Sequence, residues 1–154
     1  MTYRAPINDI LLALNHGAGL QAAVDAGHLG DYDADIAAAV LEEAGKFASD
    51  VLAPLNRVGD QNGIKLAGGK VTTAPGWPDA YQRWTAAGWN AVAGSEDFGG
   101  QGLPGAINAA CTEIWSAANV AFELCPLLTA SAIEALHAHG SDELKNIYLA
   151  KLIS

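Results

Sequence analysis

The chain has 154 residues, of which 51% are hydrophobic, 16% are charged and 31 are alanine. This length fits one domain with its own core, and so much alanine beside only 7% aromatic residues favours closely packed helices over a β-sandwich or a disordered chain. The formal net charge is −9 and the eight Lys and Arg residues are scattered, which argues against a nucleic-acid-binding surface.

The sequence gives no sign of export or of a membrane span. Asn8 and Asp9 interrupt the first apolar residues and no small-residue cleavage site follows them, so a signal peptide is not expected. No run approaches about 18 uninterrupted apolar residues. Cys111 and Cys125 lie in apolar, helix-like sequence and are too few for a disulfide framework, which indicates a reducing, cytoplasmic setting.

The first third of the chain predicts helices. A stripe of apolar residues at helical spacing runs from Ile7 to Leu14 and ends at His16–Gly17. A stronger helix follows the acidic residues 31–35, since acids favour a helix N-terminus, and Pro54 should bend or end it. The side chains expected to face inward from this helix are Ile36, Val40, Ala44, Phe47 and Val51.

Residues 64–73 carry the strand signal of the sequence. Two short runs of strand-forming residues flank Gly68–Gly69, and such a pair supplies the positive φ angles of a tight hairpin turn. Gly76-Trp77-Pro78 then begins a helix that should end at Gly88.

A glycine-rich loop over 89–105 separates this helix from the apolar part of the chain. Pro104 opens a long helix, and after Asn119 the segment Val120–Leu136 is apolar nearly all round, which predicts a central, buried helix. Gly140 ends that helix and Ser141 caps the last one. The elements together predict an all-α fold of five to six helices with one small hairpin.

The last helix reaches Ser154 with neither a C-cap glycine nor a polar tail. We therefore expect this chain to be cut from a longer protein.

Two patterns in the sequence are typical of ligand loops but have simpler explanations. Asp31, Asp33, Asp35 and Glu42 match a calcium loop, yet Ile36 stands where that loop needs glycine, so acids at a helix N-terminus are expected instead. The run over 100–105 spells G-x-G-x-x-G, but no strand precedes it. It is expected to be a connecting loop, or a glycine backbone that approaches a ligand closely.

The carboxylates and histidines of the later helices define no catalytic or metal site by themselves. Glu134 and His137 share a helix face, with His139 beside them, but no matching ligands stand elsewhere, so a metal is not expected. Glu113 and Glu123, like Glu134, lie in apolar helices, where either burial or a wet helix edge would explain them. No Ser or Cys lies in a nucleophile-elbow context.

Three segments of the sequence together resemble the N-terminal helical domain of the acyl-CoA dehydrogenases: GWNAVAGSEDFGGQGLP, CTEIWSAAN and AHGSDELKNIYLAKLIS. Upstream, VLEEAGKFASDVLAPLNRVGD and VTTAPGW resemble the longer bacterial branch that includes the 3-methylmercaptopropionyl-CoA dehydrogenase-like enzymes. The resemblance divides the chain into an N-terminal helical extension, 1–32, and the dehydrogenase N-terminal domain, 33–154.

The resemblance implies a protein with two further domains, a middle β-domain and a C-terminal four-helix bundle. In the family these hold FAD and the catalytic glutamate base, so no catalytic residue is expected in this chain, and the isolated chain should bind no FAD and be inactive. Acyl-CoA as substrate, electron-transfer flavoprotein as partner and a homo-oligomer are implied for the full enzyme. No nucleic acid is expected as a partner.

The contribution implied for this chain is part of the wall of the acyl pocket. Matching the family's loop and Gly140 without gaps places on the pocket helix Glu123, Leu124, Leu127, Leu128 and Ser131. The corresponding pocket loop consists of Phe98, Gly99, Gly100, Gln101, Gly102 and Leu103. Glu123 departs from an apolar lining, which either argues against a long, purely aliphatic substrate or means that its side chain points away.

Two other functions remain open at this point. The chain could be a stand-alone helical interaction module derived from the dehydrogenase domain, or, less favoured, a small acidic carrier of acyl groups with the apolar segment 120–136 lining a closed pocket.

Overall fold

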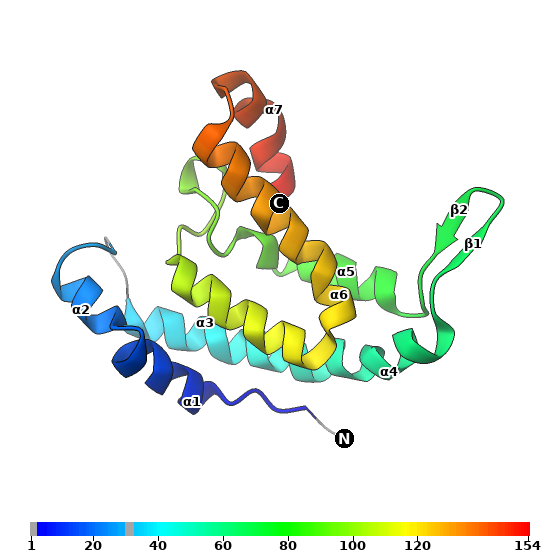
Figure 1. The fold of residues 1–154 in the computed structure, drawn as a ribbon, viewed down its shortest axis with the longest axis horizontal. Helices are drawn as coiled ribbons and strands as arrows, with labels where there is room; N and C mark the ends of the chain where they lie inside the picture. The colour runs from blue at the N-terminus through cyan, green and yellow to red at the C-terminus, as the bar shows by residue number, and fades with distance from the viewer. Residues whose placement is uncertain (1–2, 30–32) are drawn as a thin grey trace.

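The computed structural model describes residues 3–29 and 33–154, in which helices form six continuous segments and two short strands form a hairpin (Figure 1). The predicted all-α fold with one hairpin is confirmed. Asp31 of the calcium-like pattern and the expected domain boundary at residue 32 lie outside the described residues.

The N-terminal segment packs into the same core as the rest of the chain. Helix α1 (Ile7–Leu12) continues as a π-helical turn (Ala13–Gly17), and α2 (Leu20–Asp25) follows. The main core includes from this segment Ile10, Leu14 and Leu20.

A second helical segment runs from Ala34 to Asn62 and is made of three parts. These are α3 (Ala34–Phe47), a π-helical turn (Ala48–Leu52) and α4 (Ala53–Asn62). Pro54 therefore does not end the helix; the wider turn lies immediately before it, where the proline withholds a backbone donor.

The acids before α3 cap a helix, as the sequence predicted. The Asp33 carboxylate accepts hydrogen bonds from the backbone N–H groups of Asp35 (2.7 Å) and Ile36 (3.3 Å). The inward face expected for this helix was wrong at Ile36, which is exposed, whereas Ala37 and Leu41 are fully buried. The buried face of α3 differs from the predicted one because α3 packs on α1 as well as on α6.

Strands β1 (Lys65–Ala67) and β2 (Lys70–Thr72) form the predicted antiparallel hairpin. Gly68 and Gly69 make its turn with φ angles of 56° and 74°. All six strand residues are exposed, and Figure 1 shows the hairpin projecting away from the helices. Helix α5 (Trp77–Ala86) follows it.

Helix α6 (Gly105–His139) bends at Asn119, where φ is −160° and ψ is 83°. Figure 1 shows its two halves, the first arm (residues 105–118) and the second arm (residues 120–139), meeting at an angle. Helix α7 (Asp142–Ile153) packs back on the second arm, and the Ser141 hydroxyl caps it as predicted by accepting from the Leu144 N–H at 3.4 Å.

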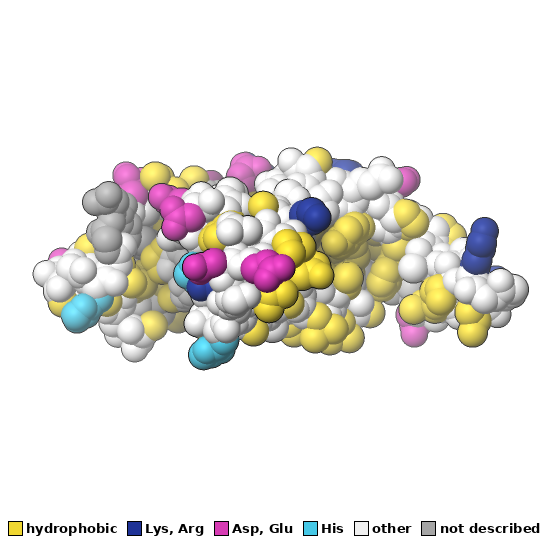
Figure 2. Space-filling view, turned by 90° about the horizontal axis from the view of Figure 1, so that it is seen from above, with side chains coloured by type: hydrophobic (Ala, Val, Ile, Leu, Met, Phe, Trp, Pro, Cys, Tyr) yellow, Lys and Arg dark blue, Asp and Glu magenta, His cyan; other side chains and the backbone are white. Residues whose placement is uncertain are grey.

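The first arm of α6 packs in the main core, whereas the second arm is buried on one side only, which corrects the expectation of a helix buried nearly all round over 120–136. Several of its apolar side chains are exposed in this chain: Val120, Leu124, Leu127 and Leu128. Because α6 bends, the second arm leaves the main core, and the other described helices cover only one side of this arm. Figure 2 shows apolar side chains grouped on the molecular surface, with carboxylates and a basic side chain beside them.

Aromatic side chains fill the centre of the main core. Trp84 is fully buried between α5 and α6, with its ring 4.4 Å from that of Trp115 and 5.7 Å from that of Phe122. Its indole N–H donates to the Asn90 side chain at 2.8 Å. The contacts of Trp84 therefore connect the start of the glycine-rich loop with both arms of α6.

Candidate functional site

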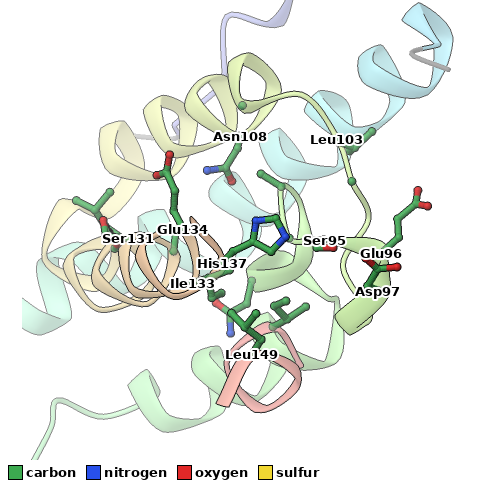
Figure 3. A pocket seen from close by; sticks show the side chains of 18 residues that line it. Ser95, Glu96, Asp97, Leu103, Asn108, Ser131, Ile133, Glu134, His137 and Leu149 are labelled. Carbon is green, nitrogen blue, oxygen red and sulfur yellow. Dashed lines mark hydrogen bonds between the residues drawn. The ribbon is translucent and has the colours of Figure 1, made fainter. Parts of the chain in front are cut away.

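A pocket of about 780 Å³ lies between the two arms of α6, α7 and the loop that precedes α6 (Figure 3). Gly105 and Asn108 line it from the first arm, and Leu127, Ser131 and Glu134 line it from the second. Figure 3 shows Asn108 across the pocket from Glu134 and Ser131, with Leu149 of α7 at the other side. The bend in α6 therefore creates the space.

Asn119 holds the bend. Its side-chain amide donates to the carbonyl oxygen of Leu52 at 3.2 Å, and its side-chain oxygen accepts from the backbone N–H of Phe122 at 3.1 Å. The second of these bonds is that of a helix N-cap, so the second arm starts as a capped helix of its own. Since Leu52 lies in the π-helical turn before α4, the angle between the arms is anchored to a distant part of the chain.

The loop beside the pocket has a fixed backbone. It contains two 3₁₀ turns, Trp89–Ala91 and Glu96–Phe98. Four consecutive N–H groups, those of residues 100–103, donate at 2.8–3.0 Å to carbonyl oxygens of residues 91–95. A Cβ atom on Gly100 would lie 2.0 Å from the Gly94 carbonyl oxygen, so glycine is required there for the loop's own packing.

Glu123 is a buried carboxyl group on the second arm, close to the bend. Its side chain is 2% exposed, and Oε2 has no hydrogen-bond partner among the described residues. Burial raises the pKa of this carboxyl to about 8, because an apolar surrounding disfavours the charged form. Cys111 on the first arm is also buried, and burial together with the charge of Glu123 raises the pKa of its thiol to about 12.

The pocket lining is acidic. Its lining includes the carboxylates of Glu96, Asp97 and Glu134, and one histidine, His137. Of the described residues that line it, none is Lys or Arg. These carboxylates disfavour phosphate and other anions, whereas Leu103, Leu127 and Ile133 add apolar surface to the same lining.

The structure brings part of the predicted site together. Gly102 and Leu103 of the predicted loop and Leu127 and Ser131 of the predicted helix line the pocket. The remaining predicted loop residues lie elsewhere. Phe98 packs in a small core cluster with Ile133 and Leu149, and the Gln101 side chain donates to the Gly88 carbonyl at 3.3 Å. Gly99 ends the second 3₁₀ turn, and Gly100 packs against the backbone of Gly94.

Of the predicted helix residues that do not line the pocket, one is buried and two are exposed. Glu123 points inward, whereas Leu124 and Leu128 are 55% and 70% exposed. Sequence reasoning missed Asn108 and Ser95 as lining residues, and it considered Glu134 and His137 only as metal ligands or a helix edge. The spacing of Leu127, Glu134 and His137 on one helix face was the available signal.

A second, shallower pocket of about 430 Å³ lies between α1 and the start of α6, away from all the predicted site residues. Alanine side chains form much of its wall, with Asp9 and Glu113 beside them.

A comparison of the sequence with models of protein families identifies the family of this chain. The model of the acyl-CoA dehydrogenase N-terminal domain matches residues 35–154, which is most of the chain. This chain belongs to the acyl-CoA dehydrogenases. The match covers the loop, both arms of α6 and α7, and therefore all the elements that form the pocket between them.

A curated relative supports the same family. The chain is 40% identical over all 154 of its residues to 3-methylmercaptopropionyl-CoA dehydrogenase of Ruegeria pomeroyi (strain ATCC 700808 / DSM 15171 / DSS-3). The chain spans 26% of the length of that enzyme.

The acyl-CoA dehydrogenases depend on FAD, but the described residues of this chain do not fit its diphosphate. The N–H groups of residues 100–103 in the G-x-G-x-x-G run are already bonded to the chain's own carbonyl groups, and the described strands form an isolated hairpin. The acidic pocket lining would also repel the diphosphate. Nothing in the described part of the chain groups three or more metal-ligating side chains.

Helix α6 is long and apolar enough to cross a membrane by length and composition alone. A core helix of a globular domain meets the same test, and the first arm packs in the main core. One such helix is weak evidence for a membrane span.

Proposed function

We propose that this chain forms the N-terminal wall of the acyl site in an FAD-dependent acyl-CoA dehydrogenase, which introduces an α,β double bond into an acyl-CoA thioester. The observation that carries the proposal is the pocket between the two arms of α6 and the preceding loop, in a chain of this family. Four of the residues predicted for the acyl site line it: Gly102, Leu103, Leu127 and Ser131.

The pocket suits the tail of the substrate better than its coenzyme. Its apolar side chains would surround the acyl chain and exclude water, and a tail held between the two arms of one bent helix has few orientations. The phosphates of coenzyme A, in contrast, need cations that the described pocket lining lacks. In this role the chain positions the substrate and supplies no catalytic residue.

We propose that the remaining parts of the active site come from further domains of the same protein. These would bind FAD, which accepts the hydride when bound, and would carry the glutamate base. The length of the relative, of which this chain spans 26%, supports such domains. A homo-oligomeric, cytoplasmic enzyme that passes its electrons to electron-transfer flavoprotein is part of the same proposal.

The proposal is tested by comparing the 154-residue chain with the product of its whole reading frame. We expect the isolated chain to show no flavin absorbance and no acyl-CoA-dependent reduction of a dye, even with added FAD, and the whole product to show both. A yellow, active isolated chain would contradict the need for further domains. A whole product that desaturates no acyl-CoA would contradict the dehydrogenase function.

A pair of variants in the whole product tests the pocket itself. Ser131→Leu fills pocket volume and should raise KM for acyl-CoA, whereas Ala132→Leu adds the same bulk at an exposed position outside the pocket lining and should leave KM unchanged. Equal effects of the two variants would argue against an acyl tail in this pocket.

The second candidate is a stand-alone interaction module, which is favoured by the exposed apolar side chains of α6 and α7 such as Leu128, Ile147 and Tyr148. A reading frame that stops after Ser154 would favour the module. A frame that continues into a β-domain would favour the dehydrogenase.

A further inference from the structure

The hairpin carries three of the most exposed large apolar side chains of the described residues. Ile64, Leu66 and Val71 are 69%, 73% and 64% exposed. Leu66 and Val71 are cross-strand partners, so they lie on the same face of the hairpin. A two-stranded hairpin alone in water is only marginally stable, so we expect a hairpin that offers such a face to solvent to pack against a partner.

The opposite face of the hairpin is basic. Side chains alternate between the two faces of a strand, so Lys65 and Lys70, which neighbour Leu66 and Val71 in the sequence, point to the other side. No acidic residue stands in the sequence 64–73. The hairpin is therefore amphipathic, with one aliphatic face and one cationic face.

The charge of the chain is distributed unevenly around this hairpin. The segment 53–86, which contains α4, the hairpin and α5, has four of the eight Lys and Arg residues but only two of the 17 Asp and Glu residues. Four basic and 15 acidic residues are left for the rest of the sequence. The hairpin projects from the helices (Figure 1), and Figure 2 shows basic and apolar side chains together at this end of the molecule. An anionic surface can thus meet the hairpin without meeting the acidic bulk of the chain.

An amphipathic element of this kind matches the interface of an anionic lipid bilayer. Such elements place aliphatic side chains at the boundary of the acyl chains and Lys side chains among the lipid phosphates. A second copy of this chain fits less well, because Figure 1 shows the hairpin and the acidic start of α3 at opposite ends of the molecule. A contact between these two ends would join copies head to tail into open chains, whereas a flat bilayer needs no matching pocket.

We propose that the hairpin is a peripheral membrane-binding element that docks on an anionic lipid bilayer. Leu66 and Val71 enter the boundary of the acyl chains, and Lys65 and Lys70 bind the phosphates of the headgroups. The hairpin lies on the bilayer and does not span it. This inference goes beyond the proposed function and does not depend on it, because none of the described residues that line the pocket between the arms of α6 belongs to the hairpin.

The test uses the product of the whole reading frame, sedimented with vesicles of phosphatidylcholine with and without phosphatidylglycerol. We expect the protein to sediment with the anionic vesicles, and salt to weaken this binding. Lys65→Gln/Lys70→Gln should weaken it about 10- to 30-fold, which is the effect of two lysines at an anionic surface. Lys145→Gln/Lys151→Gln removes the same charge from α7 and should change the binding little.

A second pair of variants tests the aliphatic face. Leu66→Ser/Val71→Ser should weaken binding to the anionic vesicles about 10-fold or more, because two aliphatic side chains no longer enter the bilayer. Leu12→Ser/Ile36→Ser replaces two side chains of α1 and α3 that are also exposed, and should leave the binding unchanged. The hairpin variants should keep the wild-type unfolding midpoint, because the substituted side chains are exposed.

A wild-type product that stays in solution with anionic vesicles at low salt would overturn the inference. Equal binding by the hairpin variants and their controls would overturn it as well, since the contact with lipid would then lie elsewhere. Self-association that the hairpin variants abolish, together with no binding to vesicles, would instead assign the aliphatic face to a second copy of the protein.

Discussion

Replacing Glu123 by glutamine is expected to stabilise this chain at neutral pH and to flatten the dependence of its stability on pH. The carboxyl group is 2% exposed and its Oε2 atom has no partner among the described residues. Burial raises its pKa from the ordinary value of 4.5 to about 8 in the folded chain. Glutamine has nearly the same shape but no charge, so the variant isolates the effect of ionisation.

The sign follows from the protons that each state binds. Between pH 4.5 and about 8 the unfolded chain has lost the Glu123 proton and the folded chain retains it, so the free energy of unfolding decreases as pH rises through this interval. The slope is at most about 1.4 kcal/mol per pH unit, which gives a ceiling of about 5 kcal/mol over the whole interval. Water entry and local rearrangement reduce this ceiling, and we expect about 2–3 kcal/mol.

Urea denaturation of the 154-residue chain at several pH values between about 6 and 8 measures this effect. The gap in stability between Glu123→Gln and the wild type should widen as pH rises. Glu134→Gln is the matched control, because Glu134 is an exposed glutamate on the same arm of α6, and its slope should equal that of the wild type. Parallel slopes for Glu123→Gln and the wild type would refute the reasoning that Glu123 is held in its acid form.

Three further predictions concern residues that fix the path of the chain. Gly100→Ala should destabilise the chain by about 3 kcal/mol or more, because the new Cβ would lie 2.0 Å from the Gly94 carbonyl oxygen, whereas Gly105→Ala, with open space around it, should change the unfolding midpoint little. Asn119→Ala should cost about 2–3 kcal/mol in urea denaturation and speed proteolysis of the second arm of α6, since two buried hydrogen bonds are lost; unchanged cleavage would argue against its anchoring role. Gly68→Val should disorder the exposed hairpin, seen as faster amide exchange in both strands, yet shift global stability by less than about 0.5 kcal/mol.

The candidate site was predictable only in part. Family resemblance pointed to Leu127 and Ser131 on the helix and to Gly102 and Leu103 in the loop, and these four residues line the pocket. Leu124 and Leu128 share the apolar character of Leu127, but their outward positions depend on how the second arm is rotated about its axis. That rotation is fixed at Asn119 by a bond to Leu52, a contact across 67 residues that no local pattern contains.

The sequence by itself determined the features that depend on neighbouring residues. The acidic start of α3, the Ser141 cap and the glycine turn of the hairpin were predicted correctly, because each arises from interactions within a few residues. Composition likewise indicated the helical class.

Only the tertiary structure decided which side chains of the second arm of α6 are buried. Its uniformly apolar sequence predicted a buried helix, but burial depends on which partners surround a helix, and the described helices cover one side of it. The same bend that exposes Leu128 draws Glu123 into the interior, between two arms that are continuous in sequence but folded toward each other. The pocket and the burial of Glu123 near the bend both depend on contacts between distant segments, and local sequence periodicity does not encode such contacts.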